Sequence, residues 1–335
     1  MNTPLSRRQF IQSCNIAIGA AMGAGLATGL GEQNQAEAAP QGALPIDTAN
    51  SVSGAPSYVN PKRVLLWENT RREVRQAFES GSLKAIILPT GSIEQHNEHM
   101  ALVADVAIAT MISHQIALRM YPRVMVAPPS PCGYAPYHMA RKGTVTLRKS
   151  TFLAYQLDVL DSLRAHGIRN MLVLNGHGGN HQPLREATPV WRELLPDVAL
   201  EVASYFQGIP REYVAEITDS PQLTSHAGEF ETSIYMAAFP ERLRRVSMDE
   251  YDEAKLNYEN GFDDKIVPFL KRDSRTEPGR LPGENGRDRR RQEESFLATA
   301  EKGEKLISKA VESWSQRLEE MIAATDAGQS WPPAE

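Results

Sequence analysis

The sequence is short of cysteine, of aromatic residues and of long apolar runs. It has two cysteines, Cys14 and Cys132, and aromatic residues make up 7% of its 335 residues. Cys14 lies in a segment that we expect to be removed, so the mature chain would keep Cys132 alone and could form no intramolecular disulfide. Beyond residue 40 no apolar stretch is long enough for a membrane-spanning helix. The sequence therefore predicts no stable membrane association.

Basic charge is not in excess either. The chain has 36 Lys and Arg against 41 Asp and Glu, a net charge of −5. Because a domain that binds nucleic acid normally presents a basic surface, this balance predicts no nucleic-acid partner. The densest charged run, residues 271–294, interleaves acids with its arginines and contains no aromatic residue. We expect a solvated loop there, or a contact within an oligomer.

The first 38 residues have the pattern of an export signal. Arg7 and Arg8 precede Phe10, a weakly apolar stretch rich in Ala and Gly spans 16–30, and small residues follow at 36–38. Paired arginines favour export by the twin-arginine translocase, with cleavage near the small residues. A membrane helix is the alternative, but Gly and Ala dominate the stretch. We therefore expect a twin-arginine signal peptide at 1–38, a linker or N-terminal extension at 39–61, and a periplasmic or secreted protein.

Between residues 84 and 204, short apolar runs alternate with helical patterns. We expect strands at 84–88, 123–127, 171–174 and 198–204, and helices at 104–120, 151–166 and 182–195. Strands separated by helices indicate parallel βαβ units, hence a three-layer α/β/α sandwich with a mostly parallel sheet. A long amphipathic helix is expected at 295–324. The length allows one large domain or two small ones, and the alternation favours one, at 62–325.

Acidic residues and histidines gather in three clusters, each placed after an expected strand or before a helix. Five of the eight histidines lie in these clusters. The first cluster contains Glu94, His96, His99 and Asp105, the second Asn175, His177, Asn180 and His181, and the third His226 and Glu231. Ligands of parallel α/β sheets collect beyond the carboxyl ends of the strands, so the clusters fall where a site is expected.

Carboxylate and imidazole without thiolate suit Zn²⁺ or Mn²⁺ and argue against a structural zinc knuckle. A histidine near a glycine-rich turn is as often a satisfied polar group as a ligand. Burying several carboxylates and imidazoles together, however, costs too much free energy without a cation. Glu98 and Glu229 are expected to be solvated or structural. His114 is expected to be structural, and His138 to line a pocket.

These clusters resemble the motifs of a known family. Residues 88–96 (LPTGSIEQH) with His99 and Asp105, residues 175–180 (NGHGGN), and His226 with the 231–233 string (ETS) are similar to the three motifs of the creatininase family, in the same order. The resemblance covers about residues 62–315, and together the motifs are specific. It implies a creatininase-like fold and assembly as a homo-oligomer, often a hexamer.

The resemblance also implies a site with two divalent metal ions, Zn²⁺ and/or Mn²⁺. In the family a carboxylate bridges the two metals, and Asp105 holds that position. Glu94 and His177 would complete one metal site, and His96 and Glu231 the other. His226 matches the family histidine that protonates the leaving nitrogen. The remaining residues, His99, Asn175, Asn180 and His138, would support the ligands or face the substrate.

The activity implied is hydrolysis of a C–N amide bond in a small cyclic amide or related compound by metal-activated water. A metallopeptidase acting on short or modified peptides and a non-catalytic metal-binding protein are the alternatives. Gly179 stands where relatives of creatininase carry a glutamate. The tryptophans that close the creatininase pocket are also missing, since only Trp191 lies between the second and third motifs. Tyr205, Phe206 and Tyr213 are the replacement candidates, which argues against creatinine itself as the substrate.

Overall fold

The computed structural model describes residues 63–139, 141–221, 223–250 and 287–332. The expected signal peptide at 1–38, the linker at 39–61 and the first part of the charged run, 271–286, lie outside the described residues. Within the described part of the chain, no helix combines the length and the apolar content that crossing a membrane requires.

A parallel four-stranded sheet forms the middle layer. Its strands are β1 (Ala85–Thr90), β2 (Val124–Val126), β3 (Asn170–Asn175) and β4 (Ala199–Ser204), in the order β2-β1-β3-β4. All three neighbouring pairs are parallel. β1 and β3 are buried along their whole length, which explains why they read as continuous apolar runs.

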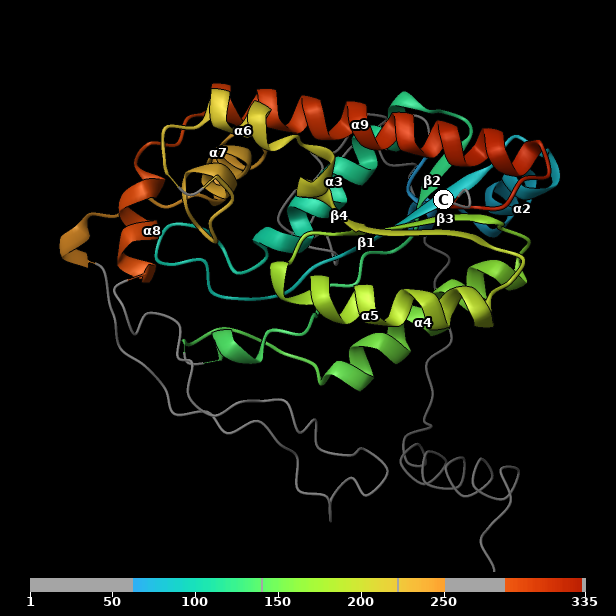
Figure 1. Cartoon of the computed structure of the whole chain (residues 1–335), viewed down its shortest axis with the longest axis horizontal. Helices are drawn as coiled ribbons and strands as arrows, with labels where there is room; N and C mark the ends of the chain where they lie inside the picture. The colour runs from blue at the N-terminus through green and yellow to red at the C-terminus, as the bar shows by residue number, and fades with distance from the viewer. Residues whose placement is uncertain (1–62, 140, 222, 251–286, 333–335) are drawn as a thin grey trace, which may run out of the picture. The chain divides into compact units, whose positions relative to one another are not determined.

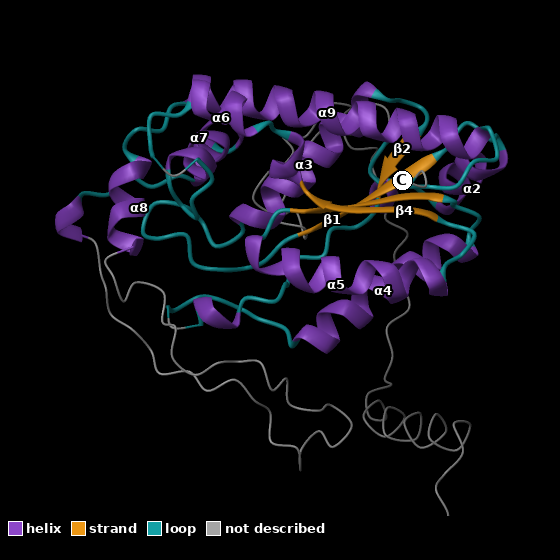
Figure 2. Ribbon diagram, viewed as in Figure 1, coloured by secondary structure: helices purple, strands orange, loops and turns teal. Residues whose placement is uncertain are grey.

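Helices cover both faces of this sheet (Figures 1 and 2). In Figure 1, α3 and α9 lie on one side of the sheet, and α4 and α5 on the other. The α-helices with their bounds are α2 (Arg71–Glu79), α3 (Ala104–Arg119), α4 (Lys149–Ala165), α5 (Gly178–Leu194), α6 (Arg211–Ile217), α7 (Glu229–Ala238), α8 (Arg287–Ser295) and α9 (Ala300–Asp326). Short 3₁₀ helices include η3 (Pro136–His138) and η4 (Tyr205–Gly208). The predicted three-layer α/β/α fold is confirmed.

Side-chain alternation along β1 divides the core in two. Ala85 and Ile87 belong to the cluster shared with α3 and α9, whereas Ile86 and Leu88 belong to the cluster shared with α4 and α5. Because successive side chains of a strand point to opposite faces, one apolar strand supplies both clusters. α3 lies between the sheet and α9, and nearly all its residues up to Ala117 are buried.

The strand order places a switch point between β1 and β3. The chain leaves β1 toward β2 on one side and returns to β3 on the other, so the connections diverge at this pair. The register pairs Thr90 with Asn175, and Asn175 with Ser204, so three strands end in one row. A ligand is expected beyond this row.

The expectations for the C-terminal part need two corrections. Residues 287–294 were expected to be loop, but they form most of α8 because Gln292 is buried against the rest of the fold. The single helix expected at 295–324 starts later, as α9 at Ala300, where the side chain of Thr299 caps it by accepting a hydrogen bond from the backbone N–H of Lys302.

Gly303 provides a test of how α9 packs. A Cβ atom at this position would lie 2.0 Å from the carbonyl oxygen of Ser233 in α7. Alanine normally stabilises a helix interior by about 1 kcal/mol relative to glycine. We expect the opposite sign here: Gly303→Ala should lower the free energy of unfolding by about 1–3 kcal/mol because α9 must move away from α7. Urea denaturation measures this change.

Ser308→Ala is the matched control, since Ser308 lies in the same helix with its side chain exposed. This variant should be neutral or slightly more stable than the parent. Equal stabilisation by both substitutions would contradict the close contact between α7 and α9.

Candidate metal centre

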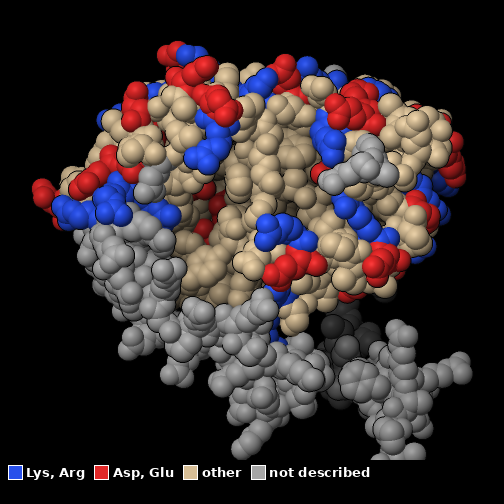
Figure 3. All heavy atoms as spheres, in the orientation of Figure 1, with Lys and Arg blue, Asp and Glu red and all other residues tan. Residues whose placement is uncertain are grey.

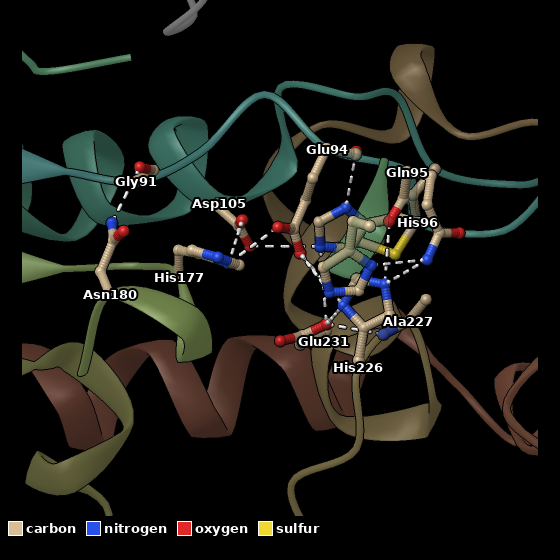
Figure 4. Close-up of polar contacts among 12 residues, drawn as sticks. Gly91, Glu94, Gln95, His96, Asp105, His177, Asn180, His226, Ala227 and Glu231 are labelled. Atoms are coloured by element: carbon tan, nitrogen blue, oxygen red, sulfur yellow. Dashed lines mark hydrogen bonds and ion pairs between the residues drawn. The ribbon is translucent and has the colours of Figure 1, made fainter. Parts of the chain in front are cut away.

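The predicted acids and histidines meet at the carboxyl end of β1 and β3 (Figure 4). Glu94 and His96 lie in the loop after β1, Asp105 in the first turn of α3, His177 at the N-cap of α5, and Glu231 in the first turn of α7. The first four are buried, and the Glu231 side chain is 17% exposed. Residues far apart in the sequence thus contribute to one cluster.

Asp105 lies between two imidazoles. Its Oδ1 is 3.2 Å from His96 Nε2, and its Oδ2 is 3.1 Å from His177 Nδ1. The two carboxylate oxygens therefore face two different histidines. This is the arrangement expected of a carboxylate shared between two cations.

Each histidine also has a second carboxylate. Glu94 Oε2 is 2.9 Å from His177 Nδ1, and Glu231 Oε2 is 3.7 Å from His96 Nε2. The side chains thus form two groups that share Asp105, as Figure 4 shows. Glu94, His96 and Asp105 also offer ligand atoms that all lie within 4.8 Å of one another, as do His96, His226 and Glu231.

The buried polar atoms of this cluster fit metal ions. Both carboxylate oxygens of Glu94, Nε2 of His96 and Oδ2 of Asp105 are buried without a well-directed hydrogen bond. Buried atoms of this kind require a compensating partner. Carboxylate oxygen and imidazole nitrogen are the ligands that Zn²⁺ and Mn²⁺ accept. The donor set therefore suits two divalent cations.

The electrostatics of the cluster show the same need for positive charge. Burial alone would lower the pKa of His96, but the carboxylates of Asp105, Glu231 and Glu94 raise it to about 10. Burial raises the pKa of Glu231 to about 7, despite the opposing charge of His96. The carboxylates thus favour the protonated form of the neighbouring imidazole, because it supplies the positive charge that they need.

His226 faces the cluster through Nδ1. This atom is 3.4 Å from Glu94 Oε1 and 4.0 Å from Glu231 Oε2. Nε2 lies 2.8 Å from the backbone carbonyl oxygen of Gln95. The side-chain amide nitrogen of Gln95 is also 3.1 Å from this Nε2, but it donates to His138 instead. Because a carbonyl oxygen only accepts, the shorter contact favours the ring hydrogen on Nε2 and leaves Nδ1 to take up a proton on the cavity side.

The side chain of Gln95 orients a further histidine. Its Nε2 is 2.9 Å from Nδ1 of His138 and donates to it, so the ring hydrogen of His138 lies on Nε2. Nε2 of His138 is 3.5 Å from Glu94 Oε1. The sequence predicted that His138 lines a pocket, and the structure places it beside the carboxylates, 7% exposed. Gln95 was not singled out in the sequence, although it lies inside the first motif.

Asn175 and Asn180 hold the loops and do not point at the cluster. The Asn175 side chain accepts from the backbone N–H of His177 and donates to the hydroxyl of Ser204, at 3.1 and 2.9 Å. The Asn180 side chain donates to the carbonyl oxygen of Gly91 at 3.0 Å. These bonds tie together the ends of β1, β3 and β4, and fix where His177 begins α5.

His99 is buried next to the cluster and bonds elsewhere. Its Nδ1 lies 3.2 Å from Oε1 of Gln292, and its Nε2 lies 2.8 Å from the hydroxyl of Thr232. Burial lowers the pKa of His99 to about 4, so the ring is neutral at pH 7. It joins the first motif to α7 and α8.

Two backbone features position the carboxylates. A Cβ atom at residue 176 would lie 2.1 Å from the carbonyl oxygen of Asp105, so only glycine lets α3 begin this close to β3. Ala227 has φ = +52°, a left-handed conformation that costs a non-glycine residue about 1–2 kcal/mol. In this conformation its N–H donates to Glu231 Oε2 at 2.7 Å. Strain at Ala227 thus orients a predicted ligand.

A cavity of about 450 Å³ opens over the cluster. Its apolar and aromatic wall contains Tyr137, Phe206 and Phe230, while Arg291 contributes a cation from α8. Figure 3 shows basic side chains gathered over α8, beside a hollow with acidic atoms in its depth. Phe206 lines the cavity as the sequence suggested, but Tyr205 is buried in the core and Tyr213 packs against it. Trp191, in α5, is also buried in the core.

Tyr137 occupies the space that a side chain at residue 179 would need. A Cβ atom on Gly179 would meet the Tyr137 hydroxyl at 1.6 Å. The position that carries glutamate in the relatives of creatininase is therefore filled here by a phenol from η3. Nothing in the sequence indicated this substitution, because residues 137 and 179 belong to different loops.

The two glutamates set aside in the sequence lie away from the cluster. Glu98 is exposed. Glu229 is fully buried, accepts backbone hydrogen bonds from Asp219 and Ser220, and forms an ion pair with Lys302 at 2.5 Å. Glu229 therefore joins α7 to α9 and does not reach the cavity.

Comparison with known proteins relates this site to several hydrolases. The chain is 28% identical over 187 residues to the 3-dehydro-scyllo-inosose hydrolase of Thermotoga maritima, covering 54% of this chain and 58% of that protein. It is 28% identical over 199 residues to the creatinine amidohydrolase of Pseudomonas putida, covering 54% and 74%. It is 29% identical over 164 residues to the mycofactocin precursor peptide peptidase of Mycobacterium ulcerans, covering 47% and 59%. The chain thus spans less than two thirds of the first and third of these relatives.

Solved structures support the fold. A tryptophan-to-phenylalanine mutant of creatininase superposes with a TM-score of 0.61 at 23% identity, covering 77% of this chain and 99% of the other. A manganese form of creatininase gives 0.58 at 22%, covering 77% and 98%. The family profile described as "Creatininase: Creatinine amidohydrolase" matches residues 67–318, more than half of the chain. This chain belongs to the creatininase family.

Proposed function

We propose that this protein is a two-metal amidohydrolase that cleaves a C–N amide bond in a small cyclic amide or a related compound. The observation that carries the proposal is the position of Asp105, whose two oxygens face the imidazoles of His96 and His177 at 3.2 and 3.1 Å. A carboxylate shared in this way is the central ligand of a two-metal site.

Glu94 and His177 would hold one metal, His96 and Glu231 the other, and Asp105 would be shared by both. Zn²⁺ and Mn²⁺ both suit these ligands. When bound, the two cations would polarise the substrate carbonyl and lower the pKa of a water molecule toward neutrality. Creatininase structures with two zinc ions and with manganese are known, which supports the same choice here.

His226 provides the proton that the reaction needs. Amide hydrolysis adds the oxygen of water to the carbonyl carbon and breaks the C–N bond, and the nitrogen leaves with a proton. Nδ1 of His226 faces the carboxylates that surround the reacting centre, while Nε2 is held by the Gln95 carbonyl. Nδ1 can therefore take up the proton that the attacking water loses and pass it to the leaving nitrogen without rotation of the ring.

Short peptides are the second candidate substrate. The relatives are named for hydrolysis of an inosose, of creatinine and of a precursor peptide, so both cyclic and linear substrates occur among them. The cavity of about 450 Å³ is in the range that holds ligands larger than a single small ring. A substrate panel therefore needs both cyclic amides and dipeptides.

We also propose that the protein is exported through the twin-arginine pathway to the periplasm or beyond. The support is the sequence of residues 1–38, which lies outside the described structure. Assembly into a homo-oligomer, a hexamer by family resemblance, is likewise a prediction. Light scattering on the purified protein would determine its mass.

Replacing Asp105 tests the shared ligand. We expect Asp105→Asn to reduce bound metal from two equivalents to one or fewer, and to lower kcat/KM roughly a thousandfold, because the neutral amide cannot balance two cations. Elemental analysis of the purified protein measures the metal. Asp158→Asn, an exposed change in α4, should keep both metals. Two full equivalents in Asp105→Asn would refute the shared ligand.

Replacing His226 separates proton transfer from metal binding. We expect His226→Ala to keep two metals and to lose about 10²–10⁴ in kcat on substrates with a basic leaving amine. 4-Nitrophenyl esters, whose leaving phenolate needs no proton, should lose much less. His166→Ala, an exposed histidine outside the site, is the control. An equal loss on both kinds of substrate would exclude the proton-donor role.

The export proposal has a matched control within the chain. Replacing Arg7 and Arg8 by lysine should leave the protein in the cytoplasm with its N-terminal segment uncleaved. The exposed pair Arg71 and Arg72 of α2 offers the control, and the same double change there should not affect export. Cell fractionation with immunoblotting provides the measurement. Normal export of the Arg7/Arg8 variant would rule out this pathway.

A further inference from the structure

α8 brings a single arginine into the cavity. Arg291 lines it together with Glu94, His226 and Glu231, whereas Arg289 and Arg290 of the same helix are exposed. Among the described residues that line the cavity, Arg291 is the one Lys or Arg. The cation is therefore a feature of the site and not of the charged helix surface in general.

The helix is fixed by the residues that directly follow this arginine. Gln292, fully buried, accepts from the ring of His99 and from the backbone N–H of Glu98, at 3.2 and 3.4 Å. Glu294 accepts from the hydroxyl of Ser225 at 2.9 Å. α8 is thus held against the loop that carries two predicted ligands and against the loop before α7. The Arg291 side chain is consequently presented to the cavity by a fixed backbone.

The charge of the site makes this position unusual. Glu94, Asp105 and Glu231 contribute three negative charges, and the two divalent cations of the proposed function contribute four positive charges. The metals by themselves would offset the carboxylates, so the guanidinium of Arg291 is not needed to balance them. A guanidinium that lines the same cavity favours a ligand with negative charge.

The position of Arg291 also indicates which half of the substrate is charged. Glu294 of α8 accepts a hydrogen bond from Ser225, the residue before His226, so α8 lies beside the loop that carries His226. Arg291 and His226 also line the same cavity. His226 is the group that we assign to the leaving nitrogen. A guanidinium on the same side of the cavity as His226 would therefore face the amine half of the substrate.

We infer, on the basis of the proposed function, that Arg291 binds a carboxylate on the amine half of the substrate. The substrate class is then an amide whose leaving nitrogen belongs to an amino acid. N-acyl amino acids, dipeptides and lactams that carry a carboxylate beside the ring nitrogen share this chemistry. Arg291 is a specificity residue: a guanidinium pairs with a carboxylate through two parallel hydrogen bonds.

The test compares matched substrates in the metal-loaded enzyme. N-acetyl amino acids and the same compounds with a carboxamide in place of the carboxylate differ only in the charge. We expect the parent enzyme to prefer the carboxylate by about 10- to 100-fold in kcat/KM, the gain typical of a charged hydrogen bond. In Arg291→Gln the ratio should fall to about 1. Arg289→Gln, on the exposed side of α8, should keep the parent ratio.

A binding measurement provides a readout that does not depend on turnover. Calorimetric titration with an N-methylated acyl amino acid, and with its carboxamide, should show tighter binding of the carboxylate by the parent and no such difference in Arg291→Gln. A parent ratio near 1 in both experiments, or an unchanged ratio in Arg291→Gln, would overturn the inference. Selective carboxylate binding without hydrolysis of any amide would keep the role of Arg291 and overturn the proposed function instead.

Discussion

Three carboxylates that converge in a buried cluster are the constraint on which this structure depends. Glu94 and Asp105 are almost fully buried, and Glu231 is nearly so. Like charges at this spacing repel strongly in a low-dielectric interior, so the carboxylates stay ionised together only with positive charge nearby. His96 and His177 meet part of that need when protonated. The two divalent cations of the proposed function would meet it fully, and the two oxygens of Asp105 face different histidines.

The fold satisfies this constraint by bringing separate segments to one row of strand ends. Thr90, Asn175 and Ser204 are aligned by the register of the sheet, and the loops that follow β1 and β3 start there. Gly176 lets α3 begin against this row, so that Asp105 reaches the space between the two loops. The apolar strands and helices behind the row are what keep the polar ends in place. Core packing and site geometry are therefore parts of one arrangement.

Much of this could be predicted from the sequence, and the failures have physical causes. Hydrophobic periodicity was sufficient to predict the sheet and its helices, and the acids and histidines that follow the strands were sufficient to predict a site at this edge of the sheet. The pairing of Glu94 with His177 came from the family resemblance. Sequence did not indicate α8, because helix 287–295 owes its place to the buried Gln292 and not to an apolar face. It also could not single out Arg291 within a run of arginines. Orientation around a helix axis is set by tertiary contacts, which local patterns do not encode.

The position of α8 has a consequence for how such a protein can diversify. The residues assigned to the metals lie between positions 94 and 231, whereas the cation over the cavity comes from position 291, on a helix joined to the rest by side-chain hydrogen bonds. Related proteins could change their substrate preference through substitutions in this helix, while the predicted metal ligands at the strand ends stay the same. Reactivity and ligand choice are then carried by different stretches of the gene. A single fold can acquire new substrates in this way while its catalytic residues stay unchanged.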